Sequence, residues 1–450
     1  MSANARSIAA YLRNLLAADG QEAVLSRLRP RGGPKVSRLP AVPTIGERTI
    51  EHVWTLPGAN ATPELKGLLC GPDVVAQAQA YANHIENFAG VVRMPLGIAG
   101  PIRVNGLFAH GEYVLPMATT EAALVASYHR GALLLTEAGG CTAALLAEGV
   151  SRTPGFAFQN LEEAGRFVLW ATSELDAFRA CAEATTRHGR LDDMKVTVEG
   201  NHVYLEFEYT TGDAAGQNMV TIATEAICDH VARNSPVKPR HQFVEANLSG
   251  DKKASARSFL SVRGKKVAAE ARIPGDLIRK RLHTTAADME AYWRMSALGG
   301  VMSGTLGVQG HYANGLAALY IACGQDAACV AESAVGVTRF ETVAAPEGNT
   351  QDLYVSVTLP NLIVGTVGGG ERGKDMGPRG DRRTPQARRE ADCGKGEGGH
   401  QRNMGSEGKP FPLIGRPTAP SGGIDVSGRR HSGFRAAAPF GPVPIVGARG

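Results

Sequence analysis

The composition of this 450-residue chain changes abruptly after Gly370. Residues 371–450 contain 17 glycines and 9 prolines in 80 positions, and their apolar residues follow neither a helical nor a strand period. Such a stretch cannot bury enough apolar surface to offset the entropy that is lost on ordering it. We therefore expect residues 371–450 to be a disordered tail. The folded core should lie within the first 370 residues, which are long enough for two domains.

The two parts of the chain also differ in charge. The formal net charge is +5, but the tail alone contains 15 Lys and Arg against 8 Asp and Glu. The first 370 residues contain 33 basic and 35 acidic side chains, a balance of −2. Because the basic character comes from the tail, it gives no reason to expect that the body binds nucleic acid.

Two sequence features indicate the cellular compartment. The chain has no run of 18 apolar residues, so no membrane span is predicted, and residues 2–18 are predicted to form a short amphipathic helix rather than a secretory signal. The seven cysteines are scattered and form no CxxC pair. This pattern favours reduced thiols in the cytoplasm, and no metal site is predicted.

Hydrophobic periodicity predicts a mixed order of helices and strands in the body. Helices are expected over residues 68–88, 119–135, 160–186, 219–234, 283–292 and 315–323. A strand segment interrupted by glycine and proline is expected before residue 114, and residues 195–209 and 352–358 alternate as strands do. The mixed order indicates an α+β fold, in which residues 155–243 form a separable block.

Three charged residues lie in surroundings that are too apolar for ordinary solvated charges. Glu121 lies in "PMATTEAALVAS", Lys252 in "SGDKK" and Asp326 in "ACGQDAA". An acid, a cation and a second carboxylate in such settings are candidates for proton transfer and charge stabilisation. For Lys252 and its neighbour Lys253, the alternative is a solvated turn.

The helix predicted after residue 119 bears on the role of Glu121. Thr119 and Thr120 are typical N-cap residues, which would place Glu121 in a first helical turn. That position favours the ionised carboxylate, so a proton-donating Glu121 would need burial or a shared proton to raise its pKa. The alternative is that Glu121 only stabilises the start of the helix.

A glycine-bearing turn, "GDAAGQNM" over residues 212–219, opens another predicted helix. The N–H groups at a helix N-terminus bind phosphate, so this turn is a candidate nucleotide site. It lacks the GxGxxG fingerprint, and a Rossmann domain is therefore not predicted. The alternative is an ordinary helix start.

Together with further blocks, these motifs resemble the catalytic domain of 3-hydroxy-3-methylglutaryl-CoA (HMG-CoA) reductases, in particular the class I branch that uses NADPH. The further blocks are "ENFAG" (86–90), "PLGIAGP" (95–101), "GVQGHYANGLAALYIACGQDAA" (307–328) and "LYVSVTLPNLIVGTVGGG" (353–370). The resemblance covers about residues 75–370. It implies a large substrate-binding domain (residues 66–154 and 244–370) with an inserted small NADP-binding domain (155–243), preceded by a helical and linker segment (1–65).

The resemblance also implies an activity and an assembly. The expected reaction is the reduction of (S)-HMG-CoA by NADPH to mevalonate and CoA, a step of isoprenoid precursor synthesis. The expected assembly is a homodimer, or a higher homo-oligomer, whose site spans the subunit interface. Two alternatives stay open: a reductase of a related acyl-CoA, or an inactive product that only binds its ligands.

Residue roles follow from the matched motifs. The resemblance implies that Lys252 stabilises the oxyanion, that Glu121 acts as the acid, and that Asp326 tunes both. The implied substrate contacts are Ser127, Arg130, Arg152, Asp251, Lys253, His311 and Asn314. The implied cofactor contacts are Arg187, Asp213, Gly216, Gln217, Asn218 and Met219.

Physical chemistry and two departures from the family pattern qualify this assignment. The guanidinium of Arg152 suits a bidentate clamp on a carboxylate, and that of Arg187 suits a 2′-phosphate, which favours NADPH over NADH. Gln217 stands where the family has Met, and Leu133 stands where a basic residue often contacts CoA.

The tail interrupts the resemblance. In the family, Leu- and Ala-rich helices follow the triple glycine and carry a catalytic histidine, whereas His400 and His431 lie in Gly- and Arg-rich sequence without a helical pattern. A reading-frame change near codon 370 would produce such a composition. We therefore expect the chain as written to be impaired by the loss of this histidine.

Overall fold

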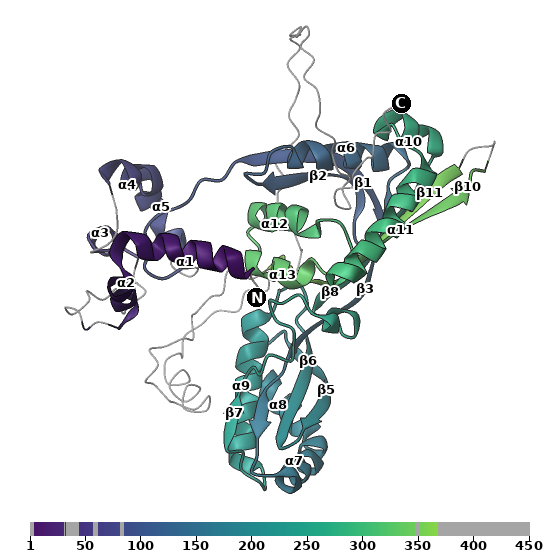
Figure 1. Ribbon diagram of the computed structural model, residues 1–450. Coiled ribbons are helices and arrows are strands. Elements are labelled where there is room, and N and C mark those ends of the chain that lie inside the picture. The colour runs from purple at the N-terminus through teal and green to yellow at the C-terminus, as the bar shows by residue number, and fades with distance from the viewer. Residues whose placement is uncertain are drawn as a thin grey trace, which may run out of the picture. The chain divides into compact units, whose positions relative to one another are not determined.

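The computed structural model describes six stretches of the chain, residues 4–30, 32, 45–56, 62–81, 85–346 and 351–367. The predicted tail, residues 371–450, lies outside the described residues. The chain divides into two compact units, Met1–Arg93 and Met94–Gly450 (Figure 1). Within the described stretches, no helix is long and apolar enough to cross a membrane.

The first unit is helical in its described parts. Its elements are α1 (Ala5–Asp19), α2 (Gln21–Leu28), α3 (Glu47–Trp54), α4 (Pro63–Leu69), α5 (Pro72–Gln77) and the 3-10 helix η1 (Ala78–Tyr81). The helix predicted over residues 2–18 is confirmed by α1. The single helix predicted over residues 68–88 is wrong, because α4 ends at Leu69 and Pro72 begins α5. A proline lacks the N–H that would continue the preceding helix, but it suits the first turn of a new one.

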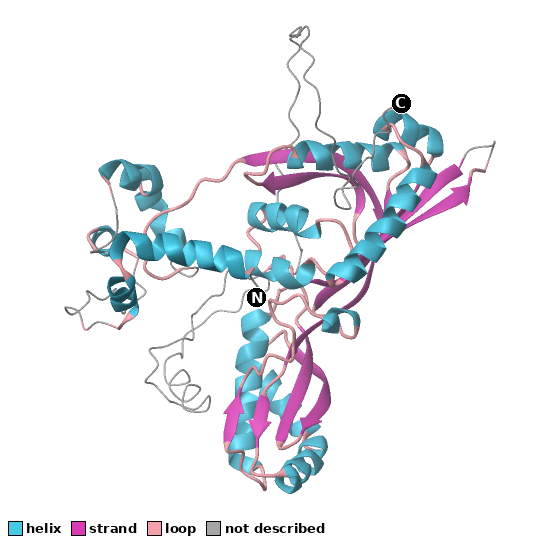
Figure 2. Cartoon of the chain, in the orientation of Figure 1, coloured by secondary structure: helices cyan, strands magenta, loops and turns pink. Residues whose placement is uncertain are grey.

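The second unit is built on a sheet in which β3 is shared by two halves. Its strands are β1 (Leu96–Gly106), β2 (His110–Ala118), β3 (Cys141–Arg152), β4 (Gly155–Ala157), β5 (Arg190–Glu199), β6 (His202–Thr210), β7 (His241–Phe243), β8 (Gly264–Ile273), β9 (Gly307–Val308), β10 (Gly336–Ala344) and β11 (Gln351–Leu362). The main path runs β7-β4-β6-β3-β8-β11-β10-β9, while β1 pairs with β2 and β3, and β5 pairs with β6 (Figure 2). The first part of β3 pairs with β8 and its last three residues pair with β6. Most pairs are antiparallel, and the mixed helices and strands confirm the α+β class.

One half of the sheet has its own core. Helices α7 (Leu161–Ser173), α8 (Leu175–Glu183) and α9 (Gln217–Asn234) contribute to it with β4–β7. Its fully buried members include five phenylalanines, Phe156, Phe158, Phe167, Phe178 and Phe207. Burying such rings removes large apolar areas from water and dominates the stability of a small core.

Two predictions for this half need correction. The helix predicted over residues 160–186 is broken at Glu174, where the backbone leaves the helical region (φ −97°, ψ 7°) between α7 and α8. The strand predicted over residues 195–209 is a hairpin, because Gly200 adopts φ 55° and turns β5 into β6. The alternation of apolar residues continues through both strands of a hairpin, so it did not reveal the turn.

The other half packs against α6 (Leu124–Glu137), α10 (Gly275–Leu282) and α11 (Ala286–Ser303). Helix α10 is additional to the prediction, and α11 starts at Ala286 rather than at 283. His283 ends α10 in the left-handed region at φ 56°, and the Thr285 hydroxyl accepts from the Asp288 N–H at 3.1 Å to cap α11. The remaining helices are α12 (Tyr312–Ala322), α13 (Val330–Ser333) and the 3-10 helices η2 (Ala256–Phe259) and η3 (Ala327–Cys329). Helix α12 and strand β11 confirm the elements predicted at 315–323 and 352–358.

Candidate functional site

Glu121 lies in an exposed loop between β2 and α6. The helix predicted from residue 119 is wrong at its start: Ala123 adopts φ 66° in the left-handed region, and α6 begins only at Leu124. Thr119 does not cap the helix, because its hydroxyl accepts from the Glu121 N–H at 3.0 Å. Glu121 therefore lies before the helix and not in its first turn. Its side chain accepts a hydrogen bond from Asn314 Nδ2 at 3.0 Å.

Helix α12 brings Asn314 to this loop. His311 precedes the helix as its N-cap, is exposed, and adopts φ 60°. Tyr128 on α6 lies so close to α12 that a Cβ added to Gly315 would meet its hydroxyl oxygen at 1.9 Å. Burial first, and then the charge of Glu121, raise the pKa of Tyr128 to about 12. Tyr128 is a part of this site that the sequence analysis missed, although it lies one turn beyond Leu124 on the helix already identified.

Lys252 and Asp326 form the second pair. Lys252 Nζ lies 2.8 Å from Asp326 Oδ2, and both side chains are about half exposed. Lys252 adopts φ 53°, an unusual backbone conformation for a lysine. Asp326 precedes η3, where its other carboxylate oxygen accepts from the Ala328 N–H at 2.9 Å.

The two members of this pair shift each other's pKa. The hydrogen bond to Asp326 raises the pKa of Lys252 above its ordinary value. Burial by itself would raise the pKa of Asp326, but the hydrogen bonds from Lys252 and Ala328 outweigh it, so the pKa lies below the ordinary value. The pair is therefore ionised over the whole neutral range.

A buried ionic cluster lies beside Lys252. Arg152, the last residue of β3, is buried; its Nη1 donates to Asp251 Oδ2 at 2.9 Å and to Glu245 Oε2 at 3.3 Å. Arg263 reaches the other oxygen of the same carboxylate, Asp251 Oδ1, at 2.5 Å. Burial alone would raise the pKa of Asp251, but first Arg263 and then Arg152 hold it below the ordinary value.

The members of this cluster were identified only in part from the sequence. Arg152 and Asp251 were predicted as substrate contacts, whereas Glu245, Arg263 and Glu332 were missed; Glu332 Oε2 lies 3.2 Å from Arg263 Nε. In this structure the guanidinium of Arg152 contacts protein carboxylates. Glu332 lies in the apolar run "CVAESAVGV", so the signal that identified Glu121, a carboxylate among apolar residues, could have found it.

Three other predicted substrate residues are Lys253, Ser127 and Arg130. Lys253 is exposed and its Nζ donates to the backbone oxygen of Asp251 at 2.5 Å. Ser127 is buried on α6, and Arg130 lies one turn further along the same helix and is half-buried.

The predicted cofactor turn is present and opens α9. Gly216 adopts φ 74° directly before Gln217, the first residue of the helix, and no side chain caps the helix N-terminus. A Cβ at Gly216 would meet the side chain of Thr211 at 2.4 Å, so the turn requires glycine on two grounds. Gln217 directs its side-chain oxygen at the arginines, accepting from Arg263 Nη2 at 2.5 Å.

Neighbouring segments pack onto this turn. The Thr366 N–H donates to the backbone oxygen of Asp213 at 2.8 Å, and the Gly365 N–H donates to Gln325 Oε1 at 2.9 Å. The loop that carries the exposed Arg187 reaches the same helix, since a Cβ at Gly189 would meet Met219 Sδ at 2.7 Å. Asn218, next to Met219, is exposed.

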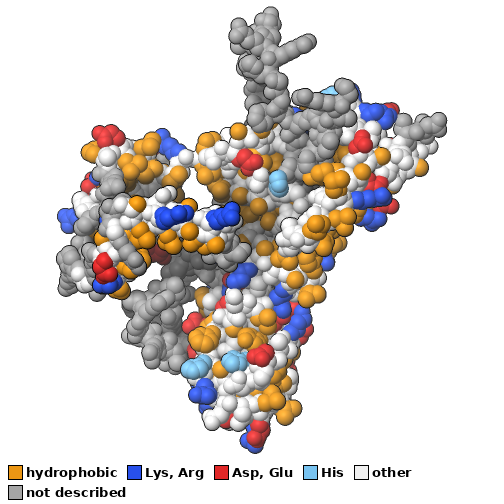
Figure 3. All heavy atoms as spheres, viewed as in Figure 1, with side chains coloured by type: hydrophobic (Ala, Val, Ile, Leu, Met, Phe, Trp, Pro, Cys, Tyr) orange, Lys and Arg blue, Asp and Glu red, His pale blue; other side chains and the backbone are white. Residues whose placement is uncertain are grey.

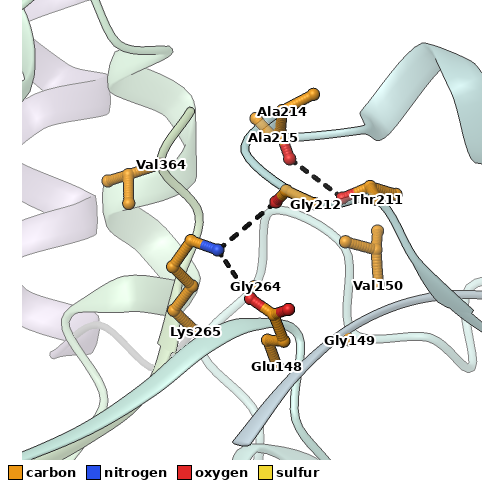
Figure 4. Close-up of a pocket in the computed structure, with 10 residues that line it drawn as sticks. All are labelled: Glu148, Gly149, Val150, Thr211, Gly212, Ala214, Ala215, Gly264, Lys265 and Val364. Carbon is orange, nitrogen blue, oxygen red and sulfur yellow. Dashed lines mark hydrogen bonds and ion pairs between the residues drawn. The ribbon is translucent and has the colours of Figure 1, made fainter. Parts of the chain in front are cut away.

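A pocket is lined in part by residues of the cofactor turn. It is lined by Glu148, Gly149, Val150, Thr211, Gly212, Ala214, Ala215, Gly264, Lys265 and Val364. Figure 4 shows Lys265 between Glu148 and Gly212, with its Nζ 2.8 Å from Glu148 Oε2 and 3.4 Å from the Gly212 carbonyl oxygen. In the described part of the chain, no three His, Cys, Asp or Glu side chains converge in a way that could hold a metal ion.

The Lys252–Asp326 pair generates a prediction about stability. Asp326→Asn should lower the free energy of unfolding by no more than about 1 kcal/mol, because half-exposed ion pairs contribute little. Because the pKa of Asp326 is lowered in the folded state, its ionised carboxylate adds to the free energy of unfolding. This contribution is lost as the pH falls through the folded-state pKa of Asp326. The raised pKa of Lys252 gives one that is lost as the pH rises through its folded-state value. The effect of the substitution should therefore stay constant between about pH 5 and pH 9.

Urea unfolding at several pH values measures this difference. Glu137→Gln, which breaks the exposed pair of Glu137 with Arg281, is the matched control. A loss that grows or shrinks strongly between these pH values would contradict the assignment of the pair.

Comparison with known proteins identifies the family. Residues 63–376 match the family model described as hydroxymethylglutaryl-coenzyme A reductase. The 3-hydroxy-3-methylglutaryl-coenzyme A reductase of Pyrococcus abyssi is 42% identical over 296 residues, 65% of this chain and 71% of the relative. That of Halobacterium salinarum is 44% identical over 293 residues, 65% of this chain and 70% of the relative. The solved structure of the class II 3-hydroxy-3-methylglutaryl-CoA reductase from Streptococcus pneumoniae bound to NADPH has a similar fold, with a TM-score of 0.51, 20% identity and coverage of 68% of this chain and 84% of that one. The chain therefore belongs to the hydroxymethylglutaryl-coenzyme A reductase family of oxidoreductases.

Proposed function

We propose that this chain reduces (S)-HMG-CoA to mevalonate and CoA with NADPH, as a member of the class I branch. The observation that carries the proposal is the Lys252–Asp326 pair, 2.8 Å apart, in a chain of this family. The thioester carbon takes up two hydrides, the carbon–sulfur bond breaks, and two protons complete the balance. The products are a primary alcohol, free CoA thiol and two oxidised cofactors.

Lys252 is the proposed cation for the oxygen that becomes negatively charged. Each hydride addition places negative charge on a carbonyl oxygen, and a fixed cation there lowers the barrier. Asp326 keeps Lys252 protonated and limits the directions in which its ammonium group points. Glu121 is the proposed acid. It lies on an exposed loop and accepts a hydrogen bond from Asn314, so the burial that a proton donor needs would have to come from bound substrate.

The residues around the glycine turn fit NADPH. NADPH supplies hydride when it is bound. The residues proposed to hold it are Arg187, Asp213, Gly216, Gln217, Asn218 and Met219. The uncapped N-terminus of α9 offers N–H groups to phosphate, and Gly216 leaves no side chain in the way. Arg187 is an exposed guanidinium on the loop that contacts α9, and a guanidinium suits a 2′-phosphate. The Streptococcus pneumoniae relative with the same fold is described as bound to NADPH, which supports a nicotinamide cofactor.

The remaining predicted residues are assigned to the substrate. Ser127 and Arg130, which share a helix face, would hold the CoA phosphates, and Lys253 and His311 are exposed near the catalytic pairs. Arg152 and Asp251 would contact the acyl group. Because Arg152 already contacts Asp251, the two residues are proposed to act as one unit.

We also propose a division into domains. Residues 155–243 would form the inserted cofactor domain, and residues 66–154 with 244–370 the substrate domain. The separate aromatic core around Phe207 supports an inserted domain, although β3 runs through both halves. A cytoplasmic location stays a prediction.

The tail is the basis of a proposal about impairment. The family match ends at residue 376, close to the change in composition. In the family, the histidine that follows protonates the departing CoA thiolate. A thiol with a pKa of about 8.5 can leave as a thiolate without a proton donor. The loss of the histidine would therefore slow the departure of CoA without preventing it.

This gives a prediction for the full chain with two substrates. Reduction of the free aldehyde intermediate, mevaldehyde, should be affected less than reduction of HMG-CoA, since no thiolate leaves. The lost acid should slow the thioester reaction by about 100- to 10,000-fold relative to a reductase that has the histidine. NADPH oxidation, measured with each substrate, tests this. Full thioester activity would contradict the proposed impairment, while binding without turnover of either substrate would favour the binding-only alternative.

A second prediction tests Lys252. Lys252→Ala should slow mevaldehyde reduction by an amount on the order of 3 kcal/mol in the barrier, because the oxyanion loses its cation. Alanine keeps the Cβ, so the backbone strain at φ 53° is unchanged. Lys280→Ala, an exposed lysine on α10, is the control. Turnover near that of the control would exclude Lys252 from the reaction.

Dimerisation is the third prediction. Helix α11 exposes apolar side chains at helical spacing, and Figure 3 shows hydrophobic side chains over this helix. They are Met295, Leu298, Val301 and Met302. Such a patch is typical of an interface, and isologous pairs are the commonest oligomers. Light scattering should give at least twice the mass of the chain, and Met302→Glu should reduce it; an active monomer would contradict the prediction.

A further inference from the structure

Arg263 is a buried cation that has no part in the proposed reaction. It directly precedes β8, and its side chain is only 2% exposed. One guanidinium reaches three elements: Asp251 Oδ1 at 2.5 Å, Gln217 Oε1 at 2.5 Å and Glu332 Oε2 at 3.2 Å. A single side chain therefore joins the Lys252 loop, the start of α9 and α13.

Glu332 is the innermost member of this group. It lies on α13 with no exposed surface. Burial raises its pKa to about 7, against the charge of Arg263 and the N–H of Lys252, which lower it. A carboxyl group in such a place is costly to ionise unless a cation stays beside it, so Glu332 and Arg263 depend on each other.

Lys252 benefits directly from this support. Its backbone lies in the left-handed region at φ 53°, which a residue with a long side chain rarely adopts. Such a conformation persists only where the surroundings hold it. Arg263 holds the preceding residue, Asp251, and the N–H of Lys252 lowers the pKa of the Glu332 carboxyl, although neither Glu332 oxygen has a hydrogen-bond partner in the described part of the chain.

Gln217 extends the support to the cofactor turn. It is the first residue of α9 and follows Gly216. Its side-chain oxygen accepts from Arg263 at 2.5 Å and from Arg152 at 3.4 Å. The start of α9 and the loop that carries Lys252 are therefore held by the same cation.

We propose that Arg263, supported by Glu332, is a positioning residue that fixes the Lys252 loop relative to the first turn of α9. The consequence for catalysis rests on the proposed function. Lys252 must face the carbonyl oxygen while hydride arrives from a cofactor held at α9, and small misplacements of reacting groups reduce rates strongly. Glu332 would act on the Lys252 loop, and the direct contact of Arg263 with Gln217 does not depend on it.

Two substitutions in the full chain separate these roles. Arg263→Lys keeps the charge but loses the forked geometry that reaches several partners at once. Glu332→Gln keeps the shape and removes the charge. Asp352→Asn is the control: Asp352 is another buried carboxylate, paired with Arg272 Nε at 2.9 Å on β11 and β8, and it contacts none of the proposed site residues.

Steady-state kinetics with mevaldehyde and NADPH give the first readout. Both substitutions should reduce kcat at least ~10-fold. Arg263→Lys should also raise the KM for NADPH several-fold, because Arg263 contacts Gln217. Glu332→Gln should leave that KM unchanged. If both residues only stabilised the fold, the KM for NADPH would change in the same way in Arg263→Lys and in Glu332→Gln.

Hydrogen exchange gives a readout that does not require activity. Peptides covering residues 249–253 should exchange faster in both variants, and peptides covering residues 217–222 only in Arg263→Lys. The proposal is overturned if exchange is unchanged in both variants, or if Asp352→Asn produces the same pattern. If the unsubstituted chain reduces neither substrate, the proposed function fails, and the exchange data still decide whether Arg263 and Glu332 hold the loop.

Discussion

The burial of two guanidinium groups at one carboxylate is the constraint on which the second unit depends. Arg152 and Arg263 are both nearly removed from water, and each reaches a different oxygen of Asp251. An arginine in such a place is tolerated only if acceptors surround it, and removing one partner leaves an uncompensated charge. Asp251 therefore acts as a bridge, and the residue that follows it, Lys252, takes its place in the site from this bridge.

The geometry of β3 explains why these charges meet. The strand pairs with β8 along its first part and with β6 over its last three residues, so Arg152 lies where the two halves of the sheet join. The cores on either side are separate sets of residues, one around Phe207 and one around Phe340. Polar groups fill the junction between them. The charged residues of the proposed site lie at this junction, which neither apolar core fills.

The sequence allowed local features of this arrangement to be predicted, but not the long-range ones. The turn before α9 could be predicted because Gly216 has a local requirement, a positive φ, and Lys252 and Asp326 were recognisable by their apolar surroundings. The bridge could not be predicted, since Arg152 and Asp251 are 99 residues apart in the sequence. The same forked donor geometry that suggested a substrate clamp at Arg152 contacts two protein carboxylates here, those of Asp251 and Glu245. The start of α6 was misplaced for a related reason: Thr119 has the residue type of an N-cap, but its hydroxyl bonds within the loop instead.

The short segment after β11 sets a limit on how far the chain can be shortened. Gly365 bonds to Gln325, next to Asp326, and Thr366 bonds to Asp213 in the turn before α9. A fragment that ends before Gly365 would leave both loops without these backbone donors, whereas one that ends after Val367 would keep them. The shortest fragment suited to nucleotide-binding studies is therefore fixed by two hydrogen bonds rather than by the edge of an apolar core.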